Sequence, residues 1–500
     1  MNFQEAKKNF IRLMDLRKAY QYADDMIYWD AMTGGPIKGI NVRSKMRSLL
    51  QSENYKILTS NQMRECIDTL KEQIDRLDIL TQGLLVIAEK DLKNIGNIPQ
   101  EEYRQYTELC SKAGIIWEEA KKKSDFSLLS PYLEKMITML KRFSEYKGYE
   151  DNIYDGLIDN NEPSMTVARL DEYFSVIKAK LIPLIGDIQQ KGKHVSNSFL
   201  YKYYSKEKQY EFARVLLDFV GYDMDAGMIS DSEHPYTMEF DITDVRFTQH
   251  IYENAVMPNI FSTLHESGHA IYEQNMDELL SGTLLARKSS CAISEGQSRM
   301  FENIFGRNVY FWEYMFPRFK DMFPEQTRNV SFKEFYHGIN MVEVSPIRIH
   351  ADELTYPLHI ILRYEIEKEL FDDNIAVKDL PDVWNKKMKE YLGINVKNDA
   401  EGVLQDMHWA GGLIGYFQSY TLGDMYAVQF DHAMRKSLDV DGLLKNGEFK
   451  EIRKWLKENV HKFGNLKTPD QIVMDATKEP LNPTYYIEYL EKKYKGLYDL

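Results

Sequence analysis

The chain has 500 residues, 43% of them hydrophobic, and carries a formal net charge of −14. This content is enough for a large buried core, and because no segment concentrates Lys or Arg, a nucleic-acid partner is not expected. The three cysteines, Cys66, Cys110 and Cys291, form no CxxC pair, which argues against a disulfide framework and a cysteine zinc site. The first ten residues contain no apolar signal core, and the aliphatic stretch 84–88 is too short to span a bilayer. We therefore expect a cytoplasmic protein with no membrane partner.

Helical periodicity dominates the chain. Only 15 Pro and 27 Gly occur, and apolar residues recur at three- and four-residue spacing on a charged background, for example across 133–143. Loops are predicted at 191–198 and 464–470, but neither resembles a flexible linker between domains, and we find no internal repeat. The pattern therefore predicts a mainly α-helical fold and a single domain over residues 1–500.

Two short segments break the helical pattern. Residues 238–242 and 245–248 alternate apolar and polar side chains, which predicts two short strands. They come directly before the most distinctive motif of the chain. A small sheet in such a position is a common way to bind a peptide as an added strand.

The segment 261–273, FSTLHESGHAIYE, contains the pattern His265-Glu266-x-x-His269. On a helix, residues four apart share one face, so both imidazoles can reach one metal ion. Glu266 follows the first histidine and can act as general base on a water at that metal. Gly268 costs a helix about 1 kcal/mol relative to Ala, so its presence suggests close packing or room for a substrate. These residues predict a catalytic metal site, with Zn²⁺ as the expected ion and Co²⁺ or Mn²⁺ as alternatives.

A catalytic zinc site normally has three protein ligands, so a third ligand is needed. The residues after His269 contain no downstream histidine of the kind that metzincins use. Glu295 and Glu302 are the candidates; they are seven residues apart and would lie on one face of a helix. The residues alone leave the choice open, and the other glutamate is expected to support a ligand or to be a surface charge.

The chain resembles the carboxypeptidase Taq family of metallocarboxypeptidases, from Trp29 to Tyr494. Besides the HExGH form of the metal motif, several further blocks match in order. They are YDGLID at 154–159, EPSMT at 162–166, HPY at 234–236, DVRFT at 244–248, IRIHAD at 347–352 and GVLQDMHW at 402–409, followed by Gly415, Tyr416, Phe417 and Tyr420. The resemblance implies peptide substrates, a homodimer, and one large helical unit with a long active-site cleft and a small antiparallel β-sheet next to the zinc helices. It also allows two lobes beside the cleft.

The resemblance also assigns the third ligand. The family's HESQS segment falls on residues 294–298, so that Glu295 corresponds to the metal-binding glutamate. The chain departs from this segment at Ser294 and Gly296, which replace His and Ser, and from the family's HPF motif at Tyr236. We therefore expect Glu295 to complete the ligand set in altered surroundings, with a metal affinity or pH dependence that differs from the family's.

Two arginines are candidates for binding the substrate's terminal carboxylate. Arg348 is the first, since a guanidinium pairs bidentately with a carboxylate, and Arg246 is its rival. Arg348 is equally suited to an ordinary helical salt bridge with Asp352, and Arg246 to a structural ion pair. His234 is expected to line the cleft or to cap a turn.

His408 and Tyr416 resemble the histidine and tyrosine that polarise the scissile carbonyl in related zinc peptidases, because both side chains can donate to an oxyanion. Tyr420, four residues further on, competes with Tyr416 for this role. The expected activity is removal of the C-terminal residue of peptides with broad specificity. The alternatives are an oligoendopeptidase of the same zinc class and a non-catalytic peptide-binding protein on the same fold.

Overall fold

The computed structural model describes residues 1–192 and 196–500 and divides the chain into two compact units. Unit 1 comprises residues 1–96, 197–332 and 430–480, and unit 2 comprises residues 97–196, 333–429 and 481–500. The loop predicted at 191–198 falls in part on residues 193–195, which lie outside the described residues. Each unit is thus built from segments that are distant in the sequence.

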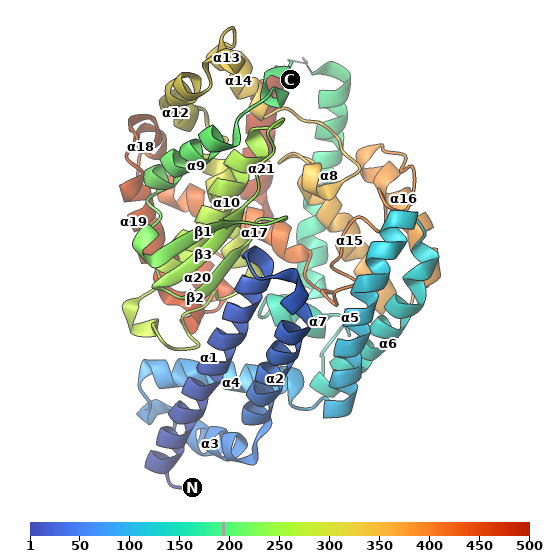
Figure 1. Ribbon diagram of the computed structural model, residues 1–500, viewed down its shortest axis with the longest axis vertical. Coiled ribbons are helices and arrows are strands. Elements are labelled where there is room, and N and C mark those ends of the chain that lie inside the picture. Colours follow the sequence, from blue (N-terminus) through green and yellow to red (C-terminus); the bar gives the residue numbers. More distant parts are fainter. Residues whose placement is uncertain (193–195) are drawn as a thin grey trace. The chain divides into compact units, whose positions relative to one another are not determined.

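The predicted mainly α-helical class is confirmed, since about 70% of the chain is helical, in 21 helices within the described residues. Unit 1 contains the three-stranded sheet whose strands are labelled in Figure 1, together with helices from three separate stretches of the chain. Its helices are α1 (Phe3–Thr33), α2 (Ile40–Thr59), α3 (Asn61–Lys71), α4 (Ile79–Ile95), α9 (Lys206–Val220), α10 (Met257–Gln274), α11 (Cys291–Arg299), α12 (Val309–Met322), α13 (Pro324–Thr327), α18 (Val440–Asn446), α19 (Phe449–Asn459) and α20 (Pro469–Thr477).

The described residues of unit 2 form helices and loops, with no strand among them. Its helices are α5 (Gln100–Lys123), α6 (Ser130–Lys147), α7 (Asp155–Asn161), α8 (Val167–Lys191), α14 (Phe332–Ile339), α15 (Tyr356–Phe371), α16 (Leu380–Leu392), α17 (Gln418–Arg435, which the division cuts at Phe430) and α21 (Pro483–Tyr498). Within this unit α8 packs against α15, α16 and α21, and α6 packs against α5, α7 and α15. Within the described ranges, no helix has both the length and the apolar character that crossing a bilayer requires.

Local sequence signals set the ends of the two helices that carry the metal motif and Glu295. Pro258 lies in the first turn of α10. Proline is tolerated there because N–H groups of the first turn make no hydrogen bond within the helix. Ser290 caps α11, because its hydroxyl accepts a 3.1 Å hydrogen bond from the backbone N–H of Ile293. After Arg299 the chain runs on as a short π-helix, Met300–Phe305, a form that often marks functional sites.

The small sheet contains three strands rather than the two predicted. They are β1 (Gly227–Asp231), β2 (Thr237–Asp241) and β3 (Asp244–Gln249), in the order β1-β3-β2. β2 and β3 pair antiparallel, but β1 pairs parallel to β3, so the expectation of an antiparallel sheet is wrong and the sheet is mixed. The sequence does not predict β1, because its buried and exposed side chains do not alternate regularly along the strand. The central strand β3 buries Val245 and Phe247 in the core of unit 1.

α10 packs against β2 and β3 and against the helices α9 and α11 (Figure 1). Gly268 lies where α10 meets α11, since a Cβ there would lie 2.6 Å from the carbonyl oxygen of Gln297 and 2.7 Å from the Cα of Ser298. Close approach of two helix backbones, rather than room for a substrate, therefore explains this glycine. The loop predicted at 464–470 holds the left-handed Gly464 (φ 48°) and ends where α20 begins.

Candidate active site

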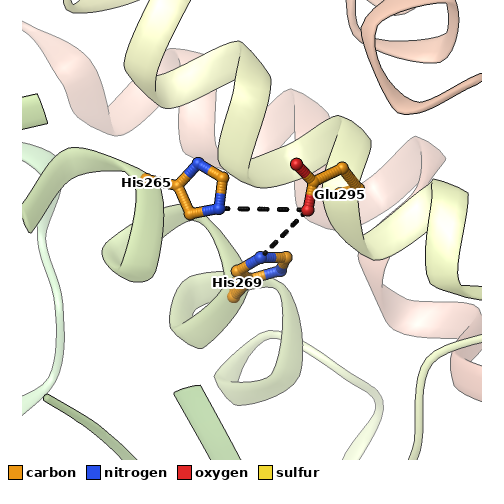
Figure 2. A group of neighbouring side chains, drawn as sticks. All are labelled: His265, His269 and Glu295. Carbon is orange, nitrogen blue, oxygen red and sulfur yellow. Dashed lines mark ion pairs between the residues drawn. The ribbon is translucent and has the colours of Figure 1, made fainter. Parts of the chain in front are cut away.

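Three potential metal ligands come together in unit 1. His265 and His269 extend from α10, and Glu295 faces them from α11 (Figure 2). The Nε2 atoms of His265 and His269 lie 3.9 Å and 3.6 Å from Oε2 of Glu295, and the ligand atoms of all three residues lie within 4.8 Å of one another. Across residues 1–192 and 196–500, no other group of histidine, cysteine and acidic side chains meets this condition.

The second nitrogen of each imidazole is held by a different partner. Nδ1 of His265 lies 2.9 Å from Oε2 of Glu302, and Nδ1 of His269 lies 2.8 Å from the hydroxyl of Ser294. When Nδ1–H donates to these oxygens, each Nε2 keeps its lone pair for a metal. Two imidazoles and a carboxylate are a donor set that zinc and other divalent transition metals accept. The residues present therefore fit a divalent cation, and Glu302 takes the supporting position.

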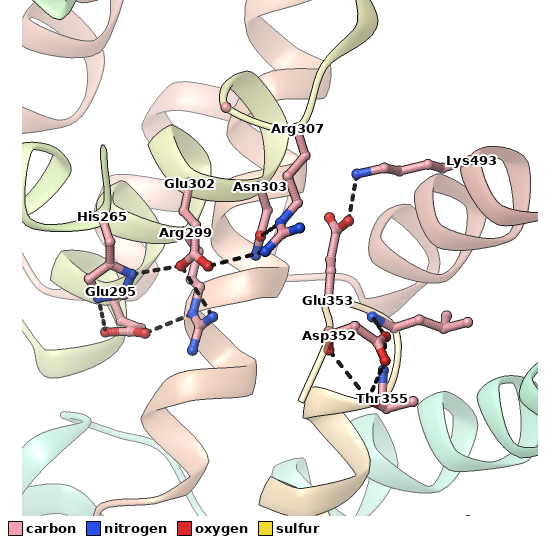
Figure 3. Close-up of polar contacts among 12 residues, drawn as sticks. His265, Glu295, Arg299, Glu302, Asn303, Arg307, Asp352, Glu353, Thr355 and Lys493 are labelled. Atoms are coloured by element: carbon pink, nitrogen blue, oxygen red, sulfur yellow. Dashed lines mark hydrogen bonds and ion pairs between the residues drawn. The ribbon is translucent and has the colours of Figure 1, made fainter. Parts of the chain in front are cut away.

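Charged neighbours stabilise both glutamates. Arg299 donates to Oε1 of Glu295 at 2.9 Å and to Oε2 of Glu302 at 3.4 Å, and Arg307 lies 3.8 Å from Oε1 of Glu302 (Figure 3). Burial opposes ionisation of Glu302, but Arg299 and His265 outweigh it and lower its pKa to about 2. His265 and Arg299 likewise outweigh burial at Glu295 and hold its pKa well below its usual range. Burial disfavours a charged His265, yet Glu295 and Glu302 raise its pKa to about 9, so the site favours positive charge.

Glu266, the candidate general base, lies beside the ligands on α10 and is buried. The hydroxyl of Thr237 on β2 donates to Oε2 of Glu266 at 2.7 Å and lies 3.1 Å from its carbonyl oxygen. The small sheet therefore fixes the orientation of this carboxylate.

The remaining candidate residues from the C-terminal half form a group within unit 2. His408 lies in the loop after α16, Tyr416 in the turn before α17, and Tyr420 in the first turn of that helix. Nε2 of His408 lies 3.3 Å from the hydroxyl of Tyr420, and the rings of Tyr416 and Tyr420 pack edge to face at 5.5 Å. Burial and the nearby Arg348 lower the pKa of His408 to about 4, so its imidazole is neutral at pH 7.

Arg348 belongs to the same group and is buried. Its Nε and Nη2 donate to Oδ1 of Asp406 at 3.1 Å and 2.9 Å, and its Nη1 donates to the hydroxyl of Tyr356 at 2.9 Å. The salt bridge with Asp352 that the spacing allows is not formed, because Arg348 begins a 3-10 turn rather than an α-helix. Asp352 instead accepts hydrogen bonds from backbone N–H groups and from Thr355.

The two candidates near the sheet have structural contacts. Nε and Nη2 of Arg246 donate to the two carboxylate oxygens of Asp244, each at 2.7 Å, and its guanidinium lies 4.6 Å from the ring centroid of Phe240. His234 is exposed between β1 and β2, and its carbonyl oxygen accepts a 2.6 Å hydrogen bond from Ser232. The Arg246–Asp244 pair is an ion pair of the kind that the structural alternative for Arg246 describes, whereas the contact of His234 involves its backbone alone.

Sequence reasoning missed several residues that support the candidate residues, among them Thr237 and Asp406. Thr237 lies just before the strand predicted at 238–242, and a lone threonine carries no signal of its own, so the sequence pattern does not single it out. Asp406 lies in the block GVLQDMHW, two residues before His408, and it pairs with both Arg348 and Arg363. That pairing joins segments far apart in the chain, which spacing does not predict.

Two imidazoles from an HExxH helix, a carboxylate from the next helix and an adjacent oriented glutamate define a metallopeptidase centre. The model of a family described as carboxypeptidase Taq (M32) metallopeptidase matches residues 9–494. The chain belongs to this family and is a metallocarboxypeptidase, as its resemblance implied.

Individual relatives agree with this assignment. Carboxypeptidase 1 of Bacillus subtilis is 45% identical over 499 residues, which cover 100% of both chains. Thermostable carboxypeptidase 1 of Pyrococcus furiosus is 34% identical over 479 residues, which cover 95% of this chain and 96% of that protein. The crystal structure of an M32 carboxypeptidase from Deinococcus radiodurans superposes with a TM-score of 0.94 at 31% identity, with 99% of both chains covered. The similarity to these relatives therefore extends over nearly the whole length of this chain and of each relative.

Proposed function

We propose that the protein is a zinc-dependent carboxypeptidase that removes single residues from the C-termini of peptides with broad specificity. The observation that carries the proposal is the convergence of Nε2 of His265 and His269 on Glu295, while Glu302 and Ser294 hold the Nδ1 atoms. When bound by these three residues, Zn²⁺, or Co²⁺ or Mn²⁺ in its place, would act as a Lewis acid on the scissile carbonyl and activate water.

Glu266 is proposed to accept the proton of the attacking water and to return it to the leaving amine. The hydrogen bond from Thr237 supports this role, because it occupies Oε2 and leaves Oε1 of the same carboxylate for the proton. A carboxylate with one fixed oxygen presents the other in a constant direction, which general base catalysis needs.

His408 and Tyr416 are proposed to donate to the oxyanion that forms at the scissile carbonyl. The pKa of His408, lowered to about 4 by burial and by Arg348, supports a neutral imidazole with one N–H to donate. The 3.3 Å contact of Tyr420 with Nε2 of His408 favours an orienting role for Tyr420 and leaves the donor role to Tyr416.

Arg348 is proposed to bind the terminal carboxylate of the substrate. It shares one group with the proposed oxyanion donors, since its guanidinium lies 5.2 Å from the ring centroid of Tyr420. Its Nη1 donates only to a neutral phenol, that of Tyr356, which a carboxylate can outcompete. Arg246 is the weaker candidate, because both oxygens of Asp244 already pair with it.

We also propose that residues 1–500 act as one catalytic domain, that the protein is a homodimer and that it resides in the cytoplasm. The family match supports the first point, because it includes segments of both units. Resemblance to the family supports the dimer, and three scattered cysteines support a reducing compartment. Light scattering after gel filtration tests the dimer, for which a mass of about twice 58.8 kDa is expected.

Mass spectrometry of a mixed peptide pool tests the reaction. The protein is loaded in turn with zinc, cobalt or manganese, and the Glu266→Gln variant is the control. Ladders shortened one residue at a time from the C-terminus, and absent with the variant, are the expected result. Internal fragments would instead identify an oligoendopeptidase. No cleavage with any of the three metals would contradict the proposal and point to a binding role, with the altered segment 294–296 as the first suspect.

A further inference from the structure

The block YDGLID at 154–159 has no part in the reaction proposed above, yet four of its six residues are buried. Tyr154 is fully buried, and α7 follows it directly. α7 is tied to its neighbours on both sides, because Lys147 of α6 donates to the carbonyl of Gly156 at 2.7 Å and Asp155 accepts from the backbone N–H of Val167 at 2.7 Å. This block is therefore a rigid element on which other segments can be fixed.

Glu367 on α15 connects this block to the loop that carries His408 and Tyr416. Glu367 is 1% exposed, and its carboxylate accepts three hydrogen bonds. Oε1 accepts from the indole N–H of Trp409 at 2.7 Å; Oε2 accepts from the backbone N–H of Gly415 at 2.7 Å and from the hydroxyl of Tyr154. Three hydrogen bonds hold this carboxylate in one orientation. The same bonds fix the positions of the three groups that donate them.

Hydrogen bonds and close packing both fix the position of Gly415. Its carbonyl oxygen accepts from the side-chain amide of Asn161 at the end of α7 at 2.8 Å and from that of Gln418 at 2.6 Å. Its φ is 77°, and a Cβ at this position would lie 3.0 Å from backbone and side-chain carbons of Leu157. Only a glycine fits this left-handed corner against α7.

The two anchored positions are the chain neighbours of the two proposed oxyanion donors. Trp409 directly follows His408, and Gly415 directly precedes Tyr416. A shift of either anchor moves the adjacent side chain with it. Because a misplacement of about 1 Å can cost a reaction about 100-fold in rate, such anchoring acts on catalysis and not only on stability.

We propose that Glu367 is a positioning residue for the reaction, and that with Tyr154 and Asn161 it holds the loop so that His408 and Tyr416 keep one orientation. The inference rests on the proposed roles of His408 and Tyr416. It gives the 154–159 block a function in the reaction although none of its residues needs to touch a substrate.

The test measures kcat and KM of the full-length, metal-loaded enzyme carrying Glu367→Gln, which keeps the shape but turns one acceptor into a donor. We expect kcat to fall about 10- to 100-fold with KM nearly unchanged. Tyr154→Phe, which removes a single donor and keeps the ring, should lower kcat in the same direction by a smaller factor. Should Glu367→Gln not fold, Tyr154→Phe and Asn161→Ala carry the test, and an unchanged kcat in both would overturn the proposal.

Glu353→Gln is the matched control. Glu353 is also a buried carboxylate of unit 2 and accepts from Tyr489, Tyr494 and Lys493, of which Lys493 is drawn with it in Figure 3. Its partners lie on α21 and not on the loop of His408, so its substitution should lower stability and leave kcat per folded molecule unchanged. An equal loss of kcat in Glu353→Gln and Glu367→Gln would overturn the positioning role.

Double variants separate this inference from the proposed function. If Glu367 acts through Tyr416, Glu367→Gln combined with Tyr416→Phe should lose less than the product of the two single losses. Multiplicative losses with both Tyr416→Phe and His408→Gln would overturn the positioning role and leave the proposed function intact. Full activity of Tyr416→Phe and of His408→Gln would contradict the proposed function itself, and the inference with it.

Discussion

The hydroxyl of Thr237 lies 2.7 Å from Oε2 of Glu266, so β2 and α10, which β3 separates in the sequence, meet at the proposed general base. β2 is an edge strand of the sheet, and the α10 helix packs against it. This hydrogen bond constrains the orientation of the carboxylate that we propose as the general base. Hydrogen bonds to charged groups are worth about 1.5–3 kcal/mol, which sets the scale of the effect.

Thr237→Val should therefore lower kcat about 10- to 100-fold, because the isosteric side chain keeps the packing and removes the donor. Thr237→Ser should retain most of the activity, since it keeps the hydroxyl. KM and bound metal are expected to stay near their original values in both variants. Steady-state kinetics with metal analysis provides the measurement, and equal kcat values for the Val and Ser variants would rule the constraint out.

The unequal partners of the two histidines predict unequal effects on metal binding. Glu302→Gln removes the negative charge beside His265, whereas Ser294→Ala removes a neutral hydroxyl beside His269. Loss of such a partner typically costs about 10- to 100-fold in metal affinity, and we expect Glu302→Gln to lie at the upper end and Ser294→Ala at the lower end. Competition with a fluorescent chelator measures both, with Thr237→Val as a control of unchanged affinity. The reverse order would show that the charge of Glu302 does not strengthen the site.

Gly268→Ala should destabilise the protein, because its Cβ would meet backbone atoms of α11 at 2.6 Å and 2.7 Å, which cannot rotate away. Forced overpacking of this kind costs about 1–3 kcal/mol, and separation of the two helices should also reduce bound metal. Gly114→Ala on α5 is the control, since apart from the backbone of its own helix and its chain neighbours no atom lies within 4 Å of the added methyl group. That variant should gain up to about 1 kcal/mol from helix propensity. Thermal unfolding and metal content distinguish the two, and equal stabilities would contradict the close approach.

Stability should fall in mild acid because of a buried neutral histidine. His461 is fully buried between Asn275 and Gln297, and burial lowers its pKa to about 3. The unfolded chain binds a proton below about pH 6.5 while the folded one does not, so this contribution is complete above pH 6.5 and is lost as the pH falls toward 3. The expected slope is up to about 1.4 kcal/mol per pH unit. Urea unfolding from pH 7 to 4 measures it, and His461→Gln should show a shallower dependence; identical slopes would contradict the assignment.

Much of the fold and part of the candidate site can be predicted without coordinates. Helical periodicity predicts the α class, and the spacing of His265, Glu266 and His269 predicts a metal-binding helix, because both depend on neighbours along one helix. β1 is not predictable in this way, since its place beside β3 comes from a parallel pairing across the chain. The choice between Glu295 and Glu302 also needs either the family resemblance or the packing of α11 on α10.

What the sequence determined by itself is the chemistry available: two histidines at helical spacing, a glutamate between them, and a chain rich in helix-forming periodicity. Only the tertiary structure decided which residues support that chemistry. Ser294 holds His269, Thr237 holds Glu266, and Glu367 holds both ends of the loop between Trp409 and Gly415. The physical reason is range. Helical spacing is a local property of consecutive residues, whereas a hydrogen bond between distant segments exists only once packing has brought their backbones together.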